Sequence, residues 1–527
     1  MGAAGRRAYI VGGGIASLAA AVFLVRDGGF AGSNIVILEE LPIAGGALDG
    51  SGDPDKGYVT RGDRMLEEEA YVCLWNLLET IPTLTDPSKS VKQEIWDFNR
   101  TWKTEARARL IDEKHNILNA ADLGFTARDR AEMTKLLALP ENTIGSRRID
   151  EFFSPHFFKT NFWAMWRTTF AFQTWSSAME LKRYFLRFAQ EFPRIHTLSG
   201  VRRTVLNQYD SIVGPVQHWL SANGVATEYG TRVTDVDFST AGLDRRATRI
   251  HFERDGIAGA YELDQDDYAF ITLGSMTSDS AYGDDDHAPE LIRDKRDGAF
   301  TLWERLAGKA PGFGRPMSFA GNVDETKWES FTLTMHSPLL LRRLTDMSGN
   351  APGTGALTTF VDSKWLMSIE VPHPPHFAGQ PDDVFTLWGY GLFVDEVGDF
   401  IGKPMSQATG QEILTELVHH LGYEDSLAEI RRTTTVIPVM MPYITSQFQP
   451  RAVGDRPHVI PKGSQNFAFL GQYTEIPEDV VFTVEYSVRG AMHGVYGLLG
   501  IDDEIPGIYH AMAHPKVALG ALKKALQ

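Results

Sequence analysis

Residues 8–26 read AYIVGGGIASLAAAVFLVR, and this stretch decides the fold class. Its first four residues are apolar and include strand-forming types, which predicts a short buried strand. The alanine- and leucine-rich part after the glycines predicts a helix. Residues 35–40, IVILEE, predict a second buried strand that ends on two acids. A strand, a helix and another strand in this order predict a βαβ unit, and therefore an α/β fold with a parallel sheet covered by helices.

Three consecutive glycines lie where the first strand must turn into the helix. Glycine lets the main chain approach a pyrophosphate closely, and a helix N-terminus offers N–H groups and the positive end of the helix dipole. A serine replaces the last glycine of the usual motif and is still small enough for close helix–strand packing. The two acids that end the second strand can accept hydrogen bonds from ribose hydroxyls. We therefore expect an adenine-dinucleotide site formed by Gly12, Gly13, Gly14, Ser17, Glu39 and Glu40.

The segments that follow favour FAD over NAD. Gly45 and Gly46 come directly after the acidic strand, as in the glutathione-reductase-like flavoproteins. Residues 268–275, YAFITLGS, and 467–472, FAFLGQ, predict later strands that resemble the segments closing over the flavin in that superfamily. The sequence contains no second glycine-rich strand–turn–helix pattern. A dedicated NAD(P)H domain is therefore not expected, which argues against a pyridine-nucleotide reductase.

Composition limits the classes of function. A chain of 527 residues is too long to fold around one compact core, so more than one domain is expected. A formal charge of −17 disfavours a nucleic-acid partner. Cys73 is the only cysteine, so neither a disulfide nor a cysteine-based metal site is expected, and no metal is predicted. This content fits a reducing cytoplasm. No apolar run approaches the roughly 20 residues of a membrane span. We expect a cytoplasmic protein whose basic C-terminal helix either docks on the body or contacts a membrane peripherally.

The order of predicted elements indicates an intertwined domain arrangement. We expect the FAD-binding domain to comprise residues 1–60, 200–280 and 435–500, and the substrate-binding and lid regions to comprise 61–199 and 281–434. Residues 501–527 form a small helical C-terminal element in this interpretation. Within the substrate region, the apolar spacing over 61–80 predicts an amphipathic helix.

Several long motifs carry a resemblance to a known family, the oleate hydratases, formerly called myosin-cross-reactive antigens. The motifs are ILEELPIAGGALDG (37–50), RGDRMLEEEAYVCLWNLLETIPTL (61–84), FFKTNFWAMWRTTFAFQTW (157–175), NQYDS (207–211), MPYITSQFQPR (441–451) and VFTVEYSVRGAM (481–492). The resemblance runs from about residue 8 to about residue 500. It implies a glutathione-reductase-like FAD-binding Rossmann domain with an intertwined β-rich and helical substrate domain. It also implies addition of water to the cis double bond of a free unsaturated fatty acid, from oleic to 10-hydroxystearic acid, with FAD bound but no net redox change.

The resemblance implies two catalytic positions. The family's proton donor is a tyrosine that corresponds here to Tyr184, and its water-activating glutamate follows the R-G-x-R motif directly. In this sequence that position is Met65, as in a subset of the family. A thioether cannot act as a base, so another group, the flavin or ordered solvent must orient the water. Glu67, Glu68 and Glu69 are the nearest acids and remain open as substitutes.

The remaining site residues also come from the resemblance. Gln208 and His376 correspond to residues that anchor the fatty carboxylate, whereas Glu370 and Pro372 replace two other anchoring positions. A glutamate would repel a carboxylate, so we expect the anchoring to differ in detail. The further contacts expected with FAD are Arg61, Arg64, Val233, Ser275, Thr483 and Ser487.

Some alternatives stay open at the level of sequence. The aromatic residues of 152–175 fit either a plain core or the wall of an acyl tunnel. A flavin-dependent double-bond isomerase or oxidoreductase, or a non-catalytic lipid-binding flavoprotein, fits the same motifs. The arm that precedes the first strand in dimeric family members is nearly absent here, so we expect a monomer.

Overall fold

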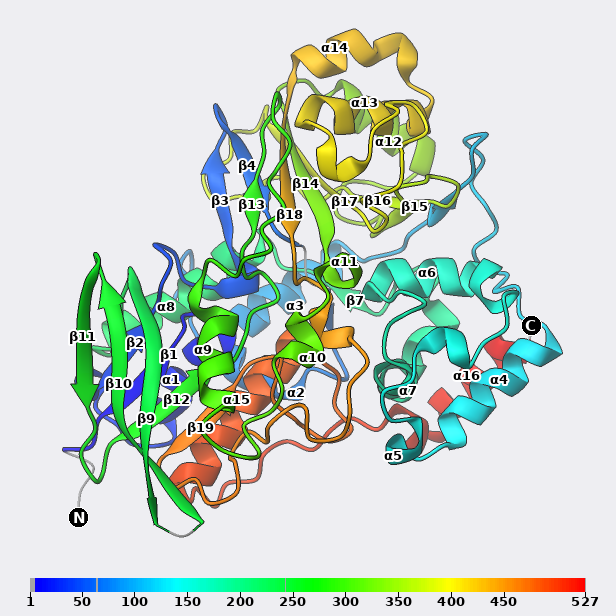
Figure 1. Cartoon of the computed structure of the whole chain (residues 1–527). Helices are drawn as coiled ribbons and strands as arrows, with labels where there is room; N and C mark the ends of the chain where they lie inside the picture. Colours follow the sequence, from blue (N-terminus) through cyan, green and yellow to red (C-terminus); the bar gives the residue numbers. More distant parts are fainter. Residues whose placement is uncertain (1–4, 63–64, 242, 527) are drawn as a thin grey trace.

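The computed structural model describes residues 5–62, 65–241 and 243–526, and it begins with the strand and helix that the sequence predicts (Figure 1). Strand β1 (Ala8–Val11) is fully buried, and helix α1 (Ile15–Arg26) is buried over its first ten residues. Small alanine side chains allow α1 to pack closely on its neighbours along nearly its whole length.

One part of the fold is built around a five-stranded sheet. All its strand pairs are parallel, and Ala8 of β1 pairs with Tyr268 on one side and Ile35 on the other. The carboxyl ends of the strands therefore lie at one edge of the sheet. The strand order is β19 (Phe467–Leu470), β12 (Tyr268–Thr272), β1, β2 (Ile35–Leu38) and β8 (Ala226–Glu228).

Alternate residues of β1 point to the two faces of this sheet, and each face has its own core. Ala8 and Ile10 belong to the core that contains α1 and α15 (Val484–Leu499), and these two helices pack on each other. Tyr9 and Val11 face the core that contains α9 (Gly298–Ala307). Three antiparallel strands flank this second face, namely β9 (Thr231–Ala241), β10 (Asp244–Arg254) and β11 (Ile257–Glu262).

The other main part of the fold is built around a seven-stranded sheet. Its pairs are antiparallel except β15 with β6, and α12 (Leu339–Ser348), α13 (Gly410–Leu421) and α14 (Leu427–Arg432) gather beside it at the top of Figure 1. The strand order is β13 (Ala281–Tyr282), β18 (Thr434–Met441), β14 (Trp328–Met335), β17 (Phe385–Gly391), β16 (Met367–Glu370), β15 (Thr358–Phe360) and β6 (Leu110–Ile111).

The strands of the two sheets can be compared with the predicted domain segments. All five strands of the parallel sheet fall within 1–60, 200–280 and 435–500. Strand β18 begins the last of these segments but belongs to the seven-stranded sheet. The division into domains stays a prediction.

The prediction of a helix over residues 61–80 was wrong in its first half. Residues Leu66–Glu67 form strand β5, paired with β7 (Val201–Arg202), and helix α2 is limited to Val72–Glu79. The Glu67 carboxylate accepts the Ala70 N–H at 2.5 Å, which closes a turn between strand and helix. Strand pairing with a distant segment therefore overrides the local apolar spacing.

Helices also build the region around the end of the chain. Helix α16 (Pro515–Leu526) packs against residues 189–194, and Arg130 Nε donates to the Ala525 carbonyl at 2.5 Å. In the part of the chain that the structure describes, no helix is long and apolar enough to cross a membrane. The other elements are β3 (Gly50–Asp53), β4 (Gly57–Thr60), α3 (Val91–Thr101), α4 (Ala127–Ala138), α5 (Glu141–Ile144), α6 (Asn161–Phe170), α7 (Ala178–Arg187), α8 (Gly214–Ala222), α10 (Met317–Ala320) and α11 (Val323–Thr326).

Candidate active site

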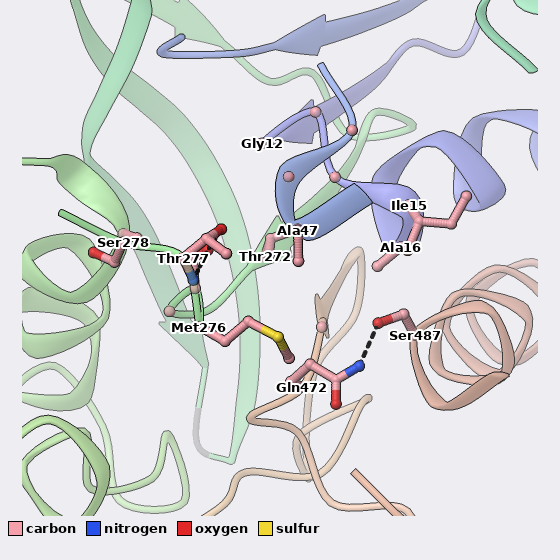
Figure 2. A pocket seen from close by; sticks show the side chains of 18 of the residues that line it. Gly12, Ile15, Ala16, Ala47, Thr272, Met276, Thr277, Ser278, Gln472 and Ser487 are labelled. Carbon is pink, nitrogen blue, oxygen red and sulfur yellow. Dashed lines mark hydrogen bonds between the residues drawn. The ribbon is translucent and has the colours of Figure 1, made fainter. Parts of the chain in front are cut away.

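A cavity of about 200 Å³ lies at the carboxyl edge of the parallel sheet, which is where open α/β sheets bind ligands. Figure 2 shows Ile15 and Ala16 on one side of this cavity, Thr277 and Ser278 on the opposite side, and Gln472 with Ser487 below. We call it the first cavity, and it is lined by residues 11–16, 38–41, 45–48, 61, 231, 233, 272, 274–278, 297–299, 302, 471–473, 482–484 and 487.

Most residues predicted to hold the cofactor line the first cavity. Ser17 does not line it, because its Oγ lies behind the glycine turn, 2.9 Å from Thr272 Oγ1. Arg64 lies outside the described residues. The predicted residues that the structure brings together are Gly12, Gly13, Gly14, Glu39, Glu40, Gly45, Gly46, Arg61, Val233, Ser275, Thr483 and Ser487.

Gly12 and Gly13 of the turn are each constrained, by main-chain conformation and by space respectively. Gly12 has φ +89°, a conformation that favours glycine, and its N–H donates to the Leu38 carbonyl at 2.8 Å. A Cβ at Gly13 would lie 2.7 Å from Glu39 Oε2. The Gly45 N–H donates to the Gly13 carbonyl at 2.8 Å, so two glycine-bearing segments cross at this point. The main chain itself is therefore exposed to the cavity.

The two acids that end β2 have different partners. Glu39 accepts the N–H groups of Gly13 at 2.5 Å and Leu41 at 2.7 Å. Burial raises the pKa of Glu39, and these two hydrogen bonds lower it. Glu40 instead accepts the Gly298 N–H at 2.9 Å, at the start of α9. Glu39 is thus the acid attached to the glycine turn.

Arg61 is a structural part of the cavity wall. It is buried, and its Nε lies 2.9 Å from Asp49 Oδ1. Its other nitrogens donate to the carbonyls of Gly46 at 2.7 Å and Thr277 at 3.0 Å. The guanidinium therefore ties the Gly45–Gly46 turn to the segment after β12.

The N-terminus of α15 faces the first cavity through Thr483 and Ser487. Gln472 holds this region, because its Nε2 donates to the Thr483 carbonyl at 2.9 Å and to Ser487 Oγ at 2.8 Å. Its Oε1 accepts the Phe482 N–H at 2.5 Å. Phe482 has φ +70°, which is strained for a bulky residue and persists only where the surroundings impose it. The positive end of a 16-residue helix is thereby aimed at the cavity.

A second cavity of about 90 Å³ adjoins the first and shares Phe482, Thr483 and Val484 with it. It is lined by residues 65–67, 71, 168–170, 184, 188, 191, 195, 198, 201, 328, 357, 388, 390 and 482–484. Trp388 and Tyr390 alternate on β17 and share a face, and the Tyr390 ring stacks on Trp328 of β14 at 4.7 Å between centroids. The walls are therefore largely aromatic and apolar.

Both predicted catalytic positions, Tyr184 and Met65, line the second cavity. Tyr184 comes from α7, which Ser177 caps by accepting the Glu180 N–H. Its hydroxyl donates to the Val481 carbonyl at 2.5 Å, and the ring packs edge-on against Phe170 and Phe172. Burial raises the pKa of Tyr184 well above its ordinary value, so the phenol keeps its proton at neutral pH.

The sequence model of the MCRA family matches residues 5–496. The chain belongs to the MCRA family. It is 39% identical over 511 residues to an oleate hydratase of Streptococcus pyogenes serotype M49, covering 95% of this chain and 86% of that protein. It is 34% identical over 562 residues to a linoleate hydratase of Lactiplantibacillus plantarum, covering 98% of each. The resemblance inferred from the motifs is confirmed.

Solved structures show the fold to which this MCRA family member belongs. Putrescine oxidase with bound putrescine is similar with a TM-score of 0.54, at 12% identity, over 94% of this chain and 99% of that one. An oxidoreductase from Methanosarcina mazei is similar with a TM-score of 0.50, at 12% identity, over 92% and 99%. These similarities and the parallel sheet confirm the predicted α/β fold with a Rossmann-type domain.

In this MCRA family member, the three glutamates after Met65 have separate environments. Glu67 lines the second cavity, and its Oε1 accepts from Gln190 Nε2 at 3.2 Å. Glu68 pairs with Arg202, and Glu69 with Arg194, outside the cavity lining. Only Glu67 of the three therefore faces the same space as Met65.

The predicted carboxylate anchors lie together but not at either cavity. Gln208 and His376 are both buried, and the Asn207 N–H donates to the His376 carbonyl at 2.7 Å. Neither Gln208 nor His376 is among the residues that line the first or the second cavity. Glu370, which replaces a neighbouring anchoring position, is paired with Arg203. That pairing offsets the repulsion expected between Glu370 and a fatty carboxylate.

The aromatic residues of 152–175 mostly form core. Phe162, Trp163, Trp166 and Phe172 are fully buried within the core that contains α1. Among the described aromatic residues of this segment, only Phe170 lines the second cavity, and an acyl tunnel stays a prediction.

Sequence reasoning missed several residues of the second cavity. Trp388 and Tyr390 carry a signal, because aromatic residues two apart on a strand share a face, whereas Trp328 joins them from β14 only through the fold. Glu191 also lines the cavity and carries a weaker signal, an acid between aromatic residues in the stretch FAQEF (188–192). Its meeting with Glu67 depends on the tertiary fold and has no local signature.

Proposed function

We propose that this protein binds FAD in the first cavity and hydrates the cis double bond of a free unsaturated fatty acid in the second. The observation that supports the proposal is that the two cavities share Phe482, Thr483 and Val484, and that Tyr184 lines the second of them. The names of the two hydratase relatives support fatty acids and water as the substrates.

The first cavity fits the parts of FAD. The Gly12–Gly14 turn and the start of α1 suit a pyrophosphate, because the main chain of these glycines lines the cavity beside a helix N-terminus. Glu39 suits the ribose hydroxyls, and the start of α15, with Thr483 and Ser487, suits the polar edge of an isoalloxazine. When bound, the flavin would supply a polar ring system at the shared wall, and hydration requires no net electron transfer from it.

The second cavity suits an alkene. Its aromatic walls exclude bulk water, which strengthens any charge interaction inside. Hydration transfers a proton to one alkene carbon, bonds a water oxygen to the other, and removes one proton from that water. The cavity volume of about 90 Å³ accommodates the double bond and its neighbours, so the rest of a long acyl chain extends beyond it.

Tyr184 is the proton donor in this proposal. Its raised pKa keeps the hydroxyl protonated, as a donor requires, but also makes it a weak acid. The hydroxyl proton is directed at the Val481 carbonyl in the structure. A bound alkene must therefore compete with that carbonyl, and charge that develops on the substrate must be stabilised locally.

The test is incubation with oleic and linoleic acids, with and without reduced FAD, followed by mass spectrometry of the products. A hydroxy acid that is heavier by one water supports hydration. A shifted double bond would instead support the isomerase, and unchanged substrate with tight lipid binding would support a non-catalytic flavoprotein.

The predictions of a monomer, a cytoplasmic location and peripheral membrane contact accompany this proposal. Light scattering tests the first, and a dimer mass would contradict it. Cell fractionation tests the location and the membrane contact together.

A further inference from the structure

Two buried carboxyl groups lie in the wall of the second cavity and have no part in the chemistry assigned so far. Glu67 and Glu191 both line the cavity, and their exposed fractions are 5% and 4%. Glu67 belongs to β5, and Glu191 follows α7, which carries Tyr184. The two acids thus come from segments that already bear Met65 and Tyr184.

Residues 65–67 run along the wall of the second cavity. Residues 66–67 are extended and form strand β5, and Met65, Leu66 and Glu67 all line the cavity. Glu67 therefore presents a carboxyl group to the same space as the side chain at position 65.

Arg194 binds this group of acids together. Its Nη2 lies 2.5 Å from Glu191 Oε1, 3.3 Å from Glu67 Oε1 and 3.4 Å from Glu69 Oε2. The other Glu191 oxygen, Oε2, is buried and receives no hydrogen bond from an N–H or hydroxyl group of the described residues. Three acids thus meet one guanidinium, and two of them, Glu67 and Glu191, line the cavity.

The balance of charge indicates that this group holds a proton. Burial, and then the neighbouring carboxylates of Glu69 and Glu191, raise the pKa of Glu67 well above its usual range. Burial also raises the pKa of Glu191, against the opposing effect of Arg194. Close carboxyl groups cannot all ionise, so the group shares a proton, and Arg194 at 2.5 Å from Glu191 Oε1 favours the charge on Glu191.

We propose that the Glu67–Glu191 pair is the base that takes a proton from the attacking water, in place of a carboxylate at position 65. The proposal rests on the proposed hydratase function. The water oxygen bonds to one alkene carbon and its proton passes to the ionised Glu191. Tyr184 gives its proton to the other carbon. Transfer of one proton from the pair back to the tyrosinate restores both groups, so one water is consumed and no proton is gained or lost.

Glu191→Gln and Glu67→Gln test the pair, with Glu68→Gln as the matched control. The control residue pairs with Arg202 rather than Arg194 and does not line the cavity. Loss of a general base typically costs 10²–10⁴-fold in rate, so each test variant should lose about 100-fold or more in kcat. Flavin content and the KM for oleate should stay within about threefold in all variants, as should kcat of the control.

Two further variants separate catalysis from folding. Glu191→Asp keeps the charge, so it should retain more activity than Glu191→Gln. Met65→Glu in the Glu191→Gln background places a carboxylate in the same cavity, and it should restore kcat by about tenfold or more.

The outcomes distinguish this proposal from the proposed function. Wild-type activity in Glu191→Gln, or equal losses in the test and control variants, would rule out the Glu67–Glu191 pair as the base. Either result would leave the proposed hydratase function intact. A wild-type protein that forms no hydroxy acid would overturn the function and the pair together.

Discussion

The Tyr184 hydroxyl donates a 2.5 Å hydrogen bond to the main-chain carbonyl of Val481. Val481 directly precedes the Phe482–Val484 segment that both cavities share. The nearby Asp479 is fixed by Arg187 and Arg489, each at 3.1 Å. The proposed proton donor is thus attached to the wall of the proposed cofactor site, which links the two cavities mechanically.

Tyr184→Phe should lower hydration by about 100-fold or more, because it removes the proton donor. It should also cost about 1–2 kcal/mol of stability, because the Val481 carbonyl loses its partner. Tyr390→Phe is the matched control, since Tyr390 lines the same cavity and also donates to a main-chain carbonyl, that of Thr168. Steady-state kinetics and urea unfolding measure both effects. Equal activity in the two variants would remove Tyr184 from the chemistry.

Gln472→Ala should weaken flavin binding as well as stability. It removes three hydrogen bonds that hold Phe482, Thr483 and Ser487 at the start of α15. A loss of about 1–3 kcal/mol in the free energy of unfolding is expected, with a weaker Kd for FAD from fluorescence titration.

Gln380→Ala is the control for that experiment. Gln380 likewise makes three hydrogen bonds to its own loop, remote from the first cavity. It should lose comparable stability while its Kd for FAD stays unchanged. A weakened Kd in both variants would show that general loosening, and not the α15 turn, sets flavin affinity.

Gly13→Ala should weaken flavin binding without unfolding the protein. The added Cβ would lie 2.7 Å from Glu39 Oε2, so the acid must leave the glycine turn. We expect the Kd for FAD to rise by about tenfold or more. In the control Gly28→Ala, the Cβ meets Leu499 Cδ1 at 2.7 Å, away from the cavity. That variant should lose stability and keep its flavin, so flavin retention in Gly13→Ala would place the cofactor elsewhere.

Asp279→Asn should stabilise the protein at high pH only. Burial and the neighbouring Asp297 raise the pKa of Asp279 to about 6. Below the unfolded value, near pH 4, the carboxyl is protonated in both states and costs nothing. The folded state therefore loses stability as the pH rises from about 4 to about 6, and the loss stays constant above that pH. The variant should gain about 1 kcal/mol at pH 8, after allowance for solvent screening, and nothing near pH 4.

The control for this prediction tests whether asparagine stabilises the protein simply by suiting a main-chain conformation with positive φ. Asp279 has φ +53°, a conformation that asparagine tolerates well, and the exposed Asp255 has φ +52°. Asp255→Asn therefore reports the main-chain effect of asparagine alone. Urea unfolding at pH 4 and pH 8 compares the variants, and an equal gain at both pH values for Asp279→Asn would contradict the electrostatic account.

Much of the first cavity could be predicted because its signals are local. The strand, glycine turn and helix of residues 8–26 fix one another within a few residues, and Glu39 ends the next strand. The error over 61–80 has the opposite origin. Leu66 and Glu67 pair with Arg202 and Val201, more than a hundred residues away, and no local pattern records that pairing.

The second cavity could be predicted only in part. Tyr184 and Met65 came from family motifs, whereas Glu191 meets Glu67 only through the fold. Gln208 and His376 also came from the motifs, and the structure places them together but away from both cavities. Residues whose role depends on a long-range meeting of side chains leave little trace in one sequence.

Oxygen-18 labelling tests the central claim most directly. The full-length protein loaded with FAD is incubated with oleic acid in oxygen-18 water, and the product is analysed by mass spectrometry. The account predicts a hydroxy acid that carries one labelled oxygen, formed by the wild type and lost in Tyr184→Phe. A hydroxy acid without the label, or no hydroxy acid from the flavin-loaded wild type, would contradict it.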